Sequence, residues 1–253
     1  MKKVFTVLIL LAVVAGCVIA AGCTAATTDN AIPDKVAYTV TVTKEGGATY
    51  NVGDIVAFTF KTNPSTGYDW QVVKGDEVLY KTIRDVKTSN ESPMMAGAPS
   101  NVTFWFQADK EGDYPIELIY ARPWDVENTT VSTYSDVLHV VKSDDPVADG
   151  PKASFTFDSF AINPEAGEFV KIVTSVPATA YASYTQSGSD GLIIRGANKP
   201  AAQDTAGSAD DLYVWYVTAA KPGDYTFVAT LEKPGSSGAL EAASGFTISL
   251  KFV

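Results

Sequence analysis

Two strands joined by a turn are predicted in residues 102–120, which read VTFWFQADKEGDYPIELIY. In residues 104–106 two phenylalanines flank a tryptophan, and in residues 114–120 aromatic and aliphatic side chains occupy every second position. Successive side chains of a strand point to opposite faces, so each run gathers large residues on one face. Gly112 and Asp113, between the two runs, are residues typical of turns.

The same period of two recurs along most of the chain that follows Cys23. The runs are rich in β-branched and aromatic residues and are separated by Gly, Pro, Asn and Asp, and no segment shows a sustained helical period. Several short strands per ~100 residues are typical of β-sandwiches and barrels, so the chain is predicted to be all-β. The alternating runs lie at residues 36–42, 55–61, 102–107, 114–120, 137–141, 155–160, 169–173, 192–194, 212–217, 225–231 and 246–252.

The alternating runs occur in two copies. The stretch from Phe104 to Tyr114 matches the stretch from Trp215 to Tyr225 at an offset of 111 residues, including the Gly-Asp-Tyr turn. A repeat of this kind indicates two units with one fold. The acidic segment SDDPVADGP at residues 143–151 has nothing to bury and is the expected linker. We therefore predict a first domain at residues 35–142 and a second at residues 152–253, with Trp215 in the core of the second.

The N-terminus has the pattern of an export segment. Two lysines precede an apolar run in residues 1–22, the order found in secretion signals. Cys17 and Cys23 each follow small residues and Gly, which resembles the lipobox of prokaryotic lipoproteins. Cys23 is the preferred lipid anchor because polar residues follow it at once, and residues 23–34 would form a tether. Cys17, or an uncleaved membrane anchor, stays open as the alternative; in each case the remaining chain is expected outside the cytoplasm, at the membrane surface.

Charge and composition exclude several functions. The chain has 19 basic and 29 acidic residues, and without residues 1–22 its net charge is −12, which disfavours binding to nucleic acid. One histidine and two cysteines rule out most Cys/His zinc sites and disulfide frameworks, so we expect no metal and no cofactor. His139 is expected to be a strand residue, and the absence of hydrolase motifs argues against an enzyme.

Three loops of the first copy carry the functional signal. Residues 63–70 read NPSTGYDW, where Asn63 can form an Asx turn, Pro64 fixes φ, and Gly67 allows a backbone shape that a Cβ would block. The second loop, residues 94–100, is small and apolar. The third loop contains Arg122-Pro123-Trp124 and follows the strand that ends at Tyr120. A tryptophan there is either a lid on the core or a binding anchor.

Together, NPSTGYDW, the Gly-Ala-Pro of the second loop and the Arg-Pro-Trp of the third resemble the motifs of the chagasin family of cysteine-peptidase inhibitors. The resemblance covers residues 35–142. It implies an immunoglobulin-like β-sandwich, in tandem with a second one, with three loops clustered at one end. It also implies reversible inhibition of papain-like cysteine peptidases, and we expect a monomer. An adhesive or structural module of the cell envelope, without inhibitory activity, is the alternative.

The resemblance assigns a role to each loop. The first would enter the active-site cleft as a wedge braced by Tyr68 and Trp70, and the other two would hold the sides of the cleft. Ala98-Pro99 departs from the Gly-rich second loop of family members, and the second copy lacks the wedge and the tryptophan, so we interpret it as degenerate. The residues implied to contact a peptidase are Asn63, Pro64, Ser65, Thr66, Gly67, Tyr68, Trp70, Gly97, Ala98, Arg122, Pro123 and Trp124.

Overall fold

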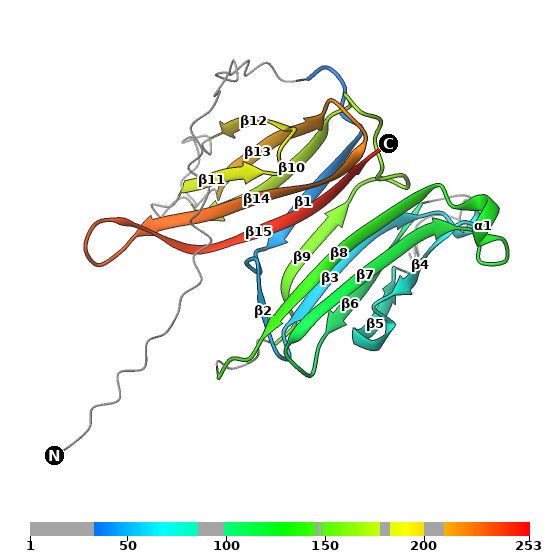
Figure 1. The fold of residues 1–253 in the computed structure, drawn as a ribbon, viewed down its shortest axis with the longest axis horizontal. Coiled ribbons are helices and arrows are strands. Elements are labelled where there is room, and N and C mark those ends of the chain that lie inside the picture. The colour runs from blue at the N-terminus through cyan, green and yellow to red at the C-terminus, as the bar shows by residue number, and fades with distance from the viewer. Residues whose placement is uncertain (1–32, 86–98, 145–146, 148, 178–182, 200–209) are drawn as a thin grey trace, which may run out of the picture.

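The computed structural model describes residues 33–85, 99–144, 147, 149–177, 183–199 and 210–253, and the regular structure in them is almost entirely β-strand (Figure 1). This confirms the predicted all-β class. The strands are β1 (Tyr38–Lys44), β2 (Tyr50–Asn51), β3 (Ile55–Thr62), β4 (Asp69–Lys74), β5 (Leu79–Arg84), β6 (Ser100–Gln107), β7 (Gly112–Ala121), β8 (Ser132–Val141), β9 (Pro151–Phe157), β10 (Val170–Pro177), β11 (Ser183–Gly188), β12 (Leu192–Lys199), β13 (Asp210–Ala219), β14 (Gly223–Pro234) and β15 (Leu240–Phe252).

Helical structure in the described part of the chain is confined to short turns. One α-helical turn, α1 (Val126–Thr129), and two 3-10 turns, Pro64–Thr66 and Asp76–Val78, lie in the first half of the chain. Within the described residues, no helix has the length and apolar character needed to cross a membrane. The predicted signal segment and Cys23 lie outside the described residues.

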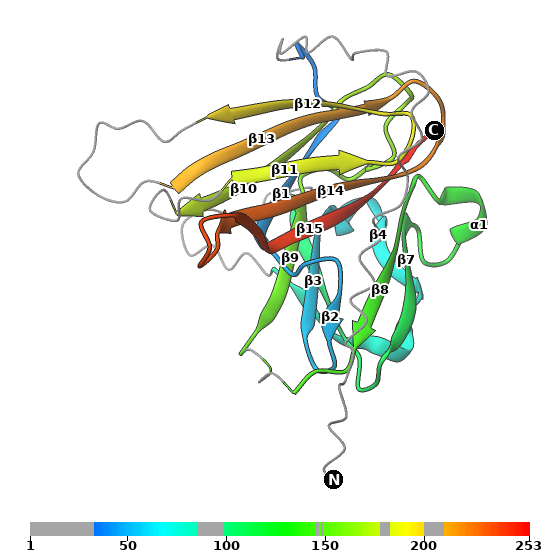
Figure 2. The ribbon, with the colours of Figure 1, turned by 60° about the vertical axis from the view of Figure 1, so that its left-hand side comes forward.

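The strands form three sheets that pack as two sandwiches (Figures 1 and 2). One long sheet has the order β12-β13-β10-β1-β9-β3-β6-β5. The sheet β2-β8-β7-β4 faces its β9-β3-β6-β5 end, where Phe58 of β3 meets Tyr134 of β8 with ring centroids 5.2 Å apart. The sheet β11-β14-β15 faces the other end, where Trp215 of β13 meets Phe246 of β15 at 6.0 Å.

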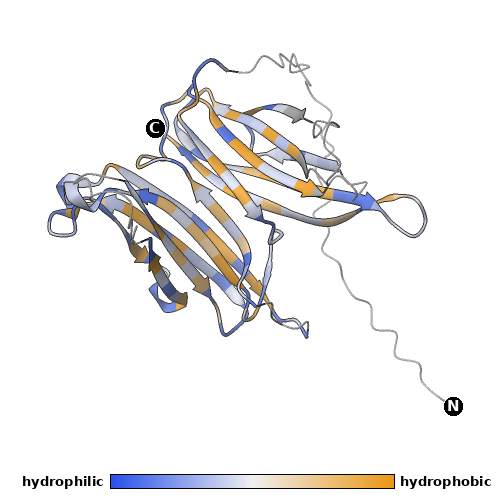
Figure 3. Ribbon diagram, turned by 180° about the vertical axis from the view of Figure 1, so that it is seen from behind, coloured by the Kyte–Doolittle hydropathy of each residue, from blue (hydrophilic) through white to orange (hydrophobic). Residues whose placement is uncertain are grey.

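Alternation along the strands separates core from surface (Figure 3). In β6, Val102, Phe104 and Phe106 are buried, and the residues between them are half-buried. Trp215 is 3% exposed, which confirms its predicted place in the core. The strand predicted at residues 155–160 is too long, because β9 ends at Phe157 and the next residues turn away from the sheet.

The sequence repeat has a matching repeat in geometry. The hydroxyl of Tyr114 donates to the carbonyl of Lys110 at 3.0 Å, and the hydroxyl of Tyr225 donates to the carbonyl of Lys221, also at 3.0 Å. The glycine before each tyrosine has nearly the same backbone, with φ of 153° at Gly112 and 154° at Gly223. Both connections, from β6 to β7 and from β13 to β14, therefore turn in the same way, and each leads from the long sheet to the sheet that faces it.

The two halves exchange their first strands, so the predicted division of the chain does not follow the pairing of the strands. Strand β1, at the start of the first half, runs parallel to β10 of the second half. Strand β9, at the start of the second half, runs parallel to β3 of the first half, and β1 and β9 pair with each other in antiparallel orientation. Figure 1 shows β9 between β1 and β3.

The connection after β8 explains why β9 stays with the first half. The end of β8 pairs with β2 at Val141 and Asn51, and β3 begins four residues further on, at Ile55. Pro151, the first residue of β9, lies opposite Ile55. The segment that joins β8 to β9 is short, so β9 begins beside the start of β3 and extends that sheet.

Polar side chains also join the halves. The side chain of Asn163 accepts from the backbone N–H of Thr133 at 2.6 Å and donates to the Thr133 carbonyl at 2.8 Å. Ser244 donates to Glu45 at 2.6 Å, and Ser249 of β15 donates to Asp136 of β8 at 3.0 Å. Burial raises the pKa of both carboxyl groups, so their charged forms are disfavoured at this junction.

Candidate functional site

The first predicted loop forms a compact 3-10 turn between β3 and β4. We call residues 63–67 the wedge loop. The backbone carbonyl of Asn63 accepts from the N–H of Thr66 at 3.0 Å and from its hydroxyl at 2.7 Å. The side-chain oxygen of Asn63 accepts from the hydroxyl of Ser65 at 2.6 Å. Pro64, Ser65 and Thr66 are exposed, so the wedge loop is held by its own hydrogen bonds and presents its tip to solvent.

Gly67 is required at the end of the turn for two reasons. Its φ is +80°, in the left-handed region that residues with a Cβ rarely adopt. A Cβ at this position would also lie 2.6 Å from Cη2 of Trp124. The first and third loops therefore touch, and the contact point is a residue without a side chain.

Trp124 lies over Gly67 and faces solvent with most of its surface. Its exposed fraction is 72%, the largest of the exposed apolar side chains in the described part of the chain. A lid on the core would be buried, so the exposure excludes that alternative. Its function as a binding anchor stays a prediction.

Trp70 and Tyr68 lie at the base of the wedge loop, and their role as a brace in a peptidase complex stays a prediction. Trp70 is 1% exposed, and its indole N–H donates to the carbonyl of Lys61 at 3.0 Å. Its ring stacks on Phe60 with centroids 4.4 Å apart. The ring of Tyr68 lies 4.9 Å from the guanidinium of Arg122, which links the base of the first loop to the third.

Sequence reasoning missed Tyr120 as part of this support. Its ring lies 5.6 Å from Tyr68 and 5.5 Å from Trp70. Burial raises the pKa of its hydroxyl, although hydrogen bonds with the Asn63 backbone and the Thr66 side chain oppose the shift. The position of Tyr120 at the end of a strand, two residues before Arg122, was the signal that could have shown it.

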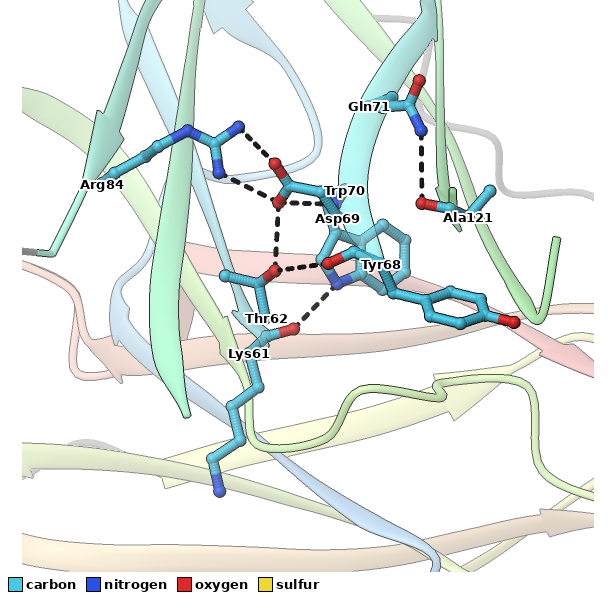
Figure 4. Close-up of polar contacts among 8 residues, drawn as sticks. All are labelled: Lys61, Thr62, Tyr68, Asp69, Trp70, Gln71, Arg84 and Ala121. Atoms are coloured by element: carbon cyan, nitrogen blue, oxygen red, sulfur yellow. Dashed lines mark hydrogen bonds and ion pairs between the residues drawn. The ribbon is translucent and has the colours of Figure 1, made fainter. Parts of the chain in front are cut away.

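A second missed feature is an ion pair at the base of the wedge loop (Figure 4). The carboxylate of Asp69 accepts from Arg84 through both oxygens, with distances of 2.9 Å to Nη1 and 2.7 Å to Nη2. It also accepts from the hydroxyl of Thr62 at 3.0 Å and from the backbone N–H of Trp70 at 2.9 Å. Asp69 begins β4 and Arg84 ends β5, so the pair ties the two sheets together at the loop end.

The third loop is also fixed from within. The N–H of Arg122 donates to the Thr129 hydroxyl at 2.9 Å, and the N–H of Asp125 donates to the Arg122 carbonyl at 3.0 Å. These bonds close the loop over α1, with Pro123 and Trp124 exposed at its tip.

Other predicted residues lie elsewhere. Gly97 and Ala98 fall outside the described residues, so the structure does not place the second loop. His139 is in β8, as predicted, and its Nδ1 lies 2.7 Å from Asp113 on the exposed face of the sheet.

The second copy has a different shape at the position of the third loop. Strands β14 and β15 continue as a paired hairpin as far as Pro234 and Leu240, so Lys233-Pro234-Gly235 forms no separate loop. The position of the wedge in the second copy is residues 176–181; β10 ends at Pro177, and the rest of this position falls outside the described residues.

The comparisons with known proteins define the class. Residues 49–137 match the sequence model of the chagasin family, peptidase inhibitor I42. Amoebiasin-2 of Entamoeba histolytica (strain ATCC 30459 / HM-1:IMSS / ABRM) is 31% identical over 99 residues, which are 38% of this chain and 80% of that protein. The chain belongs to the chagasin family of peptidase inhibitors.

Two solved structures align with part of the chain. The crystal structure of EhICP2, a cysteine protease inhibitor from Entamoeba histolytica, is 22% identical, with a TM-score of 0.31. The alignment covers 41% of this chain and 86% of that one. The solution structure of Amebosin is also 22% identical, with a TM-score of 0.29, and covers 36% of this chain and 84% of that one.

Proposed function

We propose that this chain is a surface-anchored inhibitor of papain-like cysteine peptidases, which occludes the active-site cleft reversibly with its three loops. The observation that carries the proposal is the contact between the first loop, at Gly67, and the third loop, at Trp124. Gly67 brings the ring of Trp124 directly onto the wedge loop, so the two form one exposed edge. Membership of the chagasin family of peptidase inhibitors supports the same assignment.

The wedge loop is stiff before any partner binds. Asn63 accepts three hydrogen bonds from within the loop, and Trp70 and Tyr120 pack beneath it. Because the loop is already ordered, binding costs little conformational entropy. The 3-10 turn at Pro64–Thr66 also differs from an extended backbone, so we expect it to occupy a cleft without being cleaved as a substrate.

Trp124 is the proposed anchor. A tryptophan that is 72% exposed can lose most of its accessible surface in a complex. Protease–inhibitor interfaces bury about 1,600 Å² in total, and a few residues, often Trp, Tyr and Arg, supply most of the affinity. Arg122 is already held by Tyr68 and contributes mainly by keeping the third loop in place.

The remaining features of the proposal concern location and mode of action. Residues 1–22 would direct export, Cys23 would carry the lipid, and residues 23–34 would tether a monomeric inhibitor outside the cell membrane. The inhibitor would need no cofactor and no metal, because the peptidase supplies the reactive group. Mass spectrometry of the mature N-terminus tests Cys23 against Cys17 and against an uncleaved segment.

Titration of the full chain against papain tests inhibition. We expect residual activity to fall to zero with increasing inhibitor, and the Trp124→Ala variant to bind about 2 kcal/mol more weakly. Tyr80→Ala is the matched control, because Tyr80 is an aromatic residue with 59% exposure and lies at the start of β5, away from Arg84. An absence of inhibition at micromolar concentrations, or an equal loss with Tyr80→Ala, would contradict the proposal for this enzyme.

A further inference from the structure

Strand β9 supplies part of the support of the wedge loop, although the sequence assigns it to the second half. Phe157 of β9 stacks on Phe60 of β3 with centroids 4.8 Å apart and an interplanar angle of 11°. Phe155 stacks in the same way on Phe58 at 5.4 Å. Both β9 side chains are almost completely buried. The core under the first half is therefore completed by residues from the second.

A series of stacked aromatic side chains connects β9 to the wedge loop. Phe60, which lies against Phe157, also stacks on Trp70 at 4.4 Å. The indole N–H of Trp70 donates to the carbonyl of Lys61, just before the loop begins. Displacement of Phe157 would leave one face of Phe60 without a partner and allow Trp70 to move.

The residues that follow β9 also contact the side chains that support the wedge loop. Phe160 stacks on Tyr120 with centroids 6.2 Å apart, and Tyr120 packs against Tyr68 and Trp70. Asp158 forms an ion pair with Lys61, the residue whose carbonyl accepts from Trp70. Two contacts, on β3 and on β7, therefore connect this segment to the wedge loop.

We infer that residues 151–163 belong to the inhibitory module, and that Phe157 and Phe160 are positioning residues for the wedge loop. This inference rests on the proposed function and assigns a role to the second copy. That copy lacks the loop motifs, but its first strand and the turn after it complete the base of the site in the first copy. Phe157 is not expected to touch the peptidase, since it is 1% exposed, and Phe160 is half-buried against Tyr120.

The first test uses the full chain with a serine-protease recognition sequence inserted between β8 and β9, in residues 143–150. After cleavage we expect both pieces to elute together in gel filtration and to inhibit papain as the uncleaved chain does, because the exchanged strands hold them. Separate elution, with full inhibition by the N-terminal piece alone, would overturn the inference. If the uncleaved chain fails to inhibit, the proposed function is wrong, while elution still reports on the exchange.

The second test separates positioning from stability. Phe160→Ala and Phe157→Leu should each raise the inhibition constant about tenfold, the value of one aromatic contact of ~1.4 kcal/mol. Phe160→Tyr should restore tight inhibition, because it keeps the ring that faces Tyr120. Phe227→Leu is the matched control: Phe227 is completely buried in β14 of the other sandwich and packs against Trp215, as Phe157 is buried against Phe60.

The control and the variants should lower the melting temperature similarly, but Phe227→Leu should leave the inhibition constant unchanged at a temperature where every variant is folded. Equal inhibition constants for all the variants would show that Phe157 and Phe160 stabilise the fold without positioning the loop. Equal weakening by Phe227→Leu would show that any loss of core packing is sufficient. Either result would refute the assigned role.

Discussion

Replacing Gly67 by alanine tests whether the wedge loop and the third loop, which contains Trp124, act as one unit. The new Cβ would meet two obstacles. At φ of +80°, an L-residue costs about 1–2 kcal/mol more than glycine. The Cβ would also lie 2.6 Å from Cη2 of Trp124, a distance that forces the ring to move. The backbone strain lowers the stability of the fold, and the displacement of the Trp124 ring changes the shape of the exposed edge.

The effect of the substitution on stability and its effect on inhibition are measured separately and differ in size. Because Pro64, Ser65 and Thr66 are exposed and the core lies below them, we expect unfolding to become easier by only about 1–2 kcal/mol. Loss of the Trp124 contact is expected to weaken binding by about 2 kcal/mol, which corresponds to an inhibition constant about 30-fold higher. The measurements are inhibition of papain and thermal unfolding of the same preparation.

Gly167→Ala is the matched control for the backbone. Gly167 has φ of +94°, and a Cβ there would meet no atom within 4 Å. This variant should lose similar stability and inhibit normally. The reasoning would be refuted if Gly67→Ala inhibited within twofold of the unmodified chain, or if Gly167→Ala weakened inhibition to the same extent.

Three further predictions address the support of the site. Asp69→Asn should weaken inhibition several-fold, because the pair with Arg84 ties the wedge strand to β5; unchanged inhibition constants would contradict this. Trp70→Phe should lower stability by about 1 kcal/mol in chemical denaturation, since its indole bond to the backbone is lost. Burial raises the pKa of Asp136 and Glu45, so the folded state binds more protons at these groups, and the free energy of unfolding should fall as pH rises above their ordinary pKa; a melting temperature no higher at pH 4.5, the ordinary pKa for Glu45, than at pH 7 would contradict it.

The strands could be predicted because burial on one face imposes the alternation. Residues 102–107 show the pattern clearly, since Val102, Phe104 and Phe106 all point into the core. Strand β5 could not be found in this way, because it is an edge strand with little burial, and Arg84 was missed with it. The loop motifs predicted the wedge because each residue there acts locally, through turn geometry and hydrogen bonds to near neighbours.

The strand exchange could not be predicted, because the sequences of β1 and β9 fit either position. Both strands alternate and place apolar residues in the core: Val40 and Val42 in one, Phe155 and Phe157 in the other. When two strands have the same hydrophobic pattern, the length of the connections and the packing between the sheets decide which neighbour each strand pairs with. These depend on residues far apart in the sequence, such as Pro151 opposite Ile55.

Comparing the two copies distinguishes the residues that maintain the fold from those that inhibition would require. Both copies keep the tyrosine turn, with Tyr114 and Tyr225 bonded to matching carbonyls. The third loop is different: the first copy places Trp124 on a loop closed by Thr129, and the second continues as a plain hairpin. A sandwich tolerates such changes because its loops lie outside the core. The second copy is therefore free to lose the loops, but it must keep β9 if the first copy is to hold its wedge.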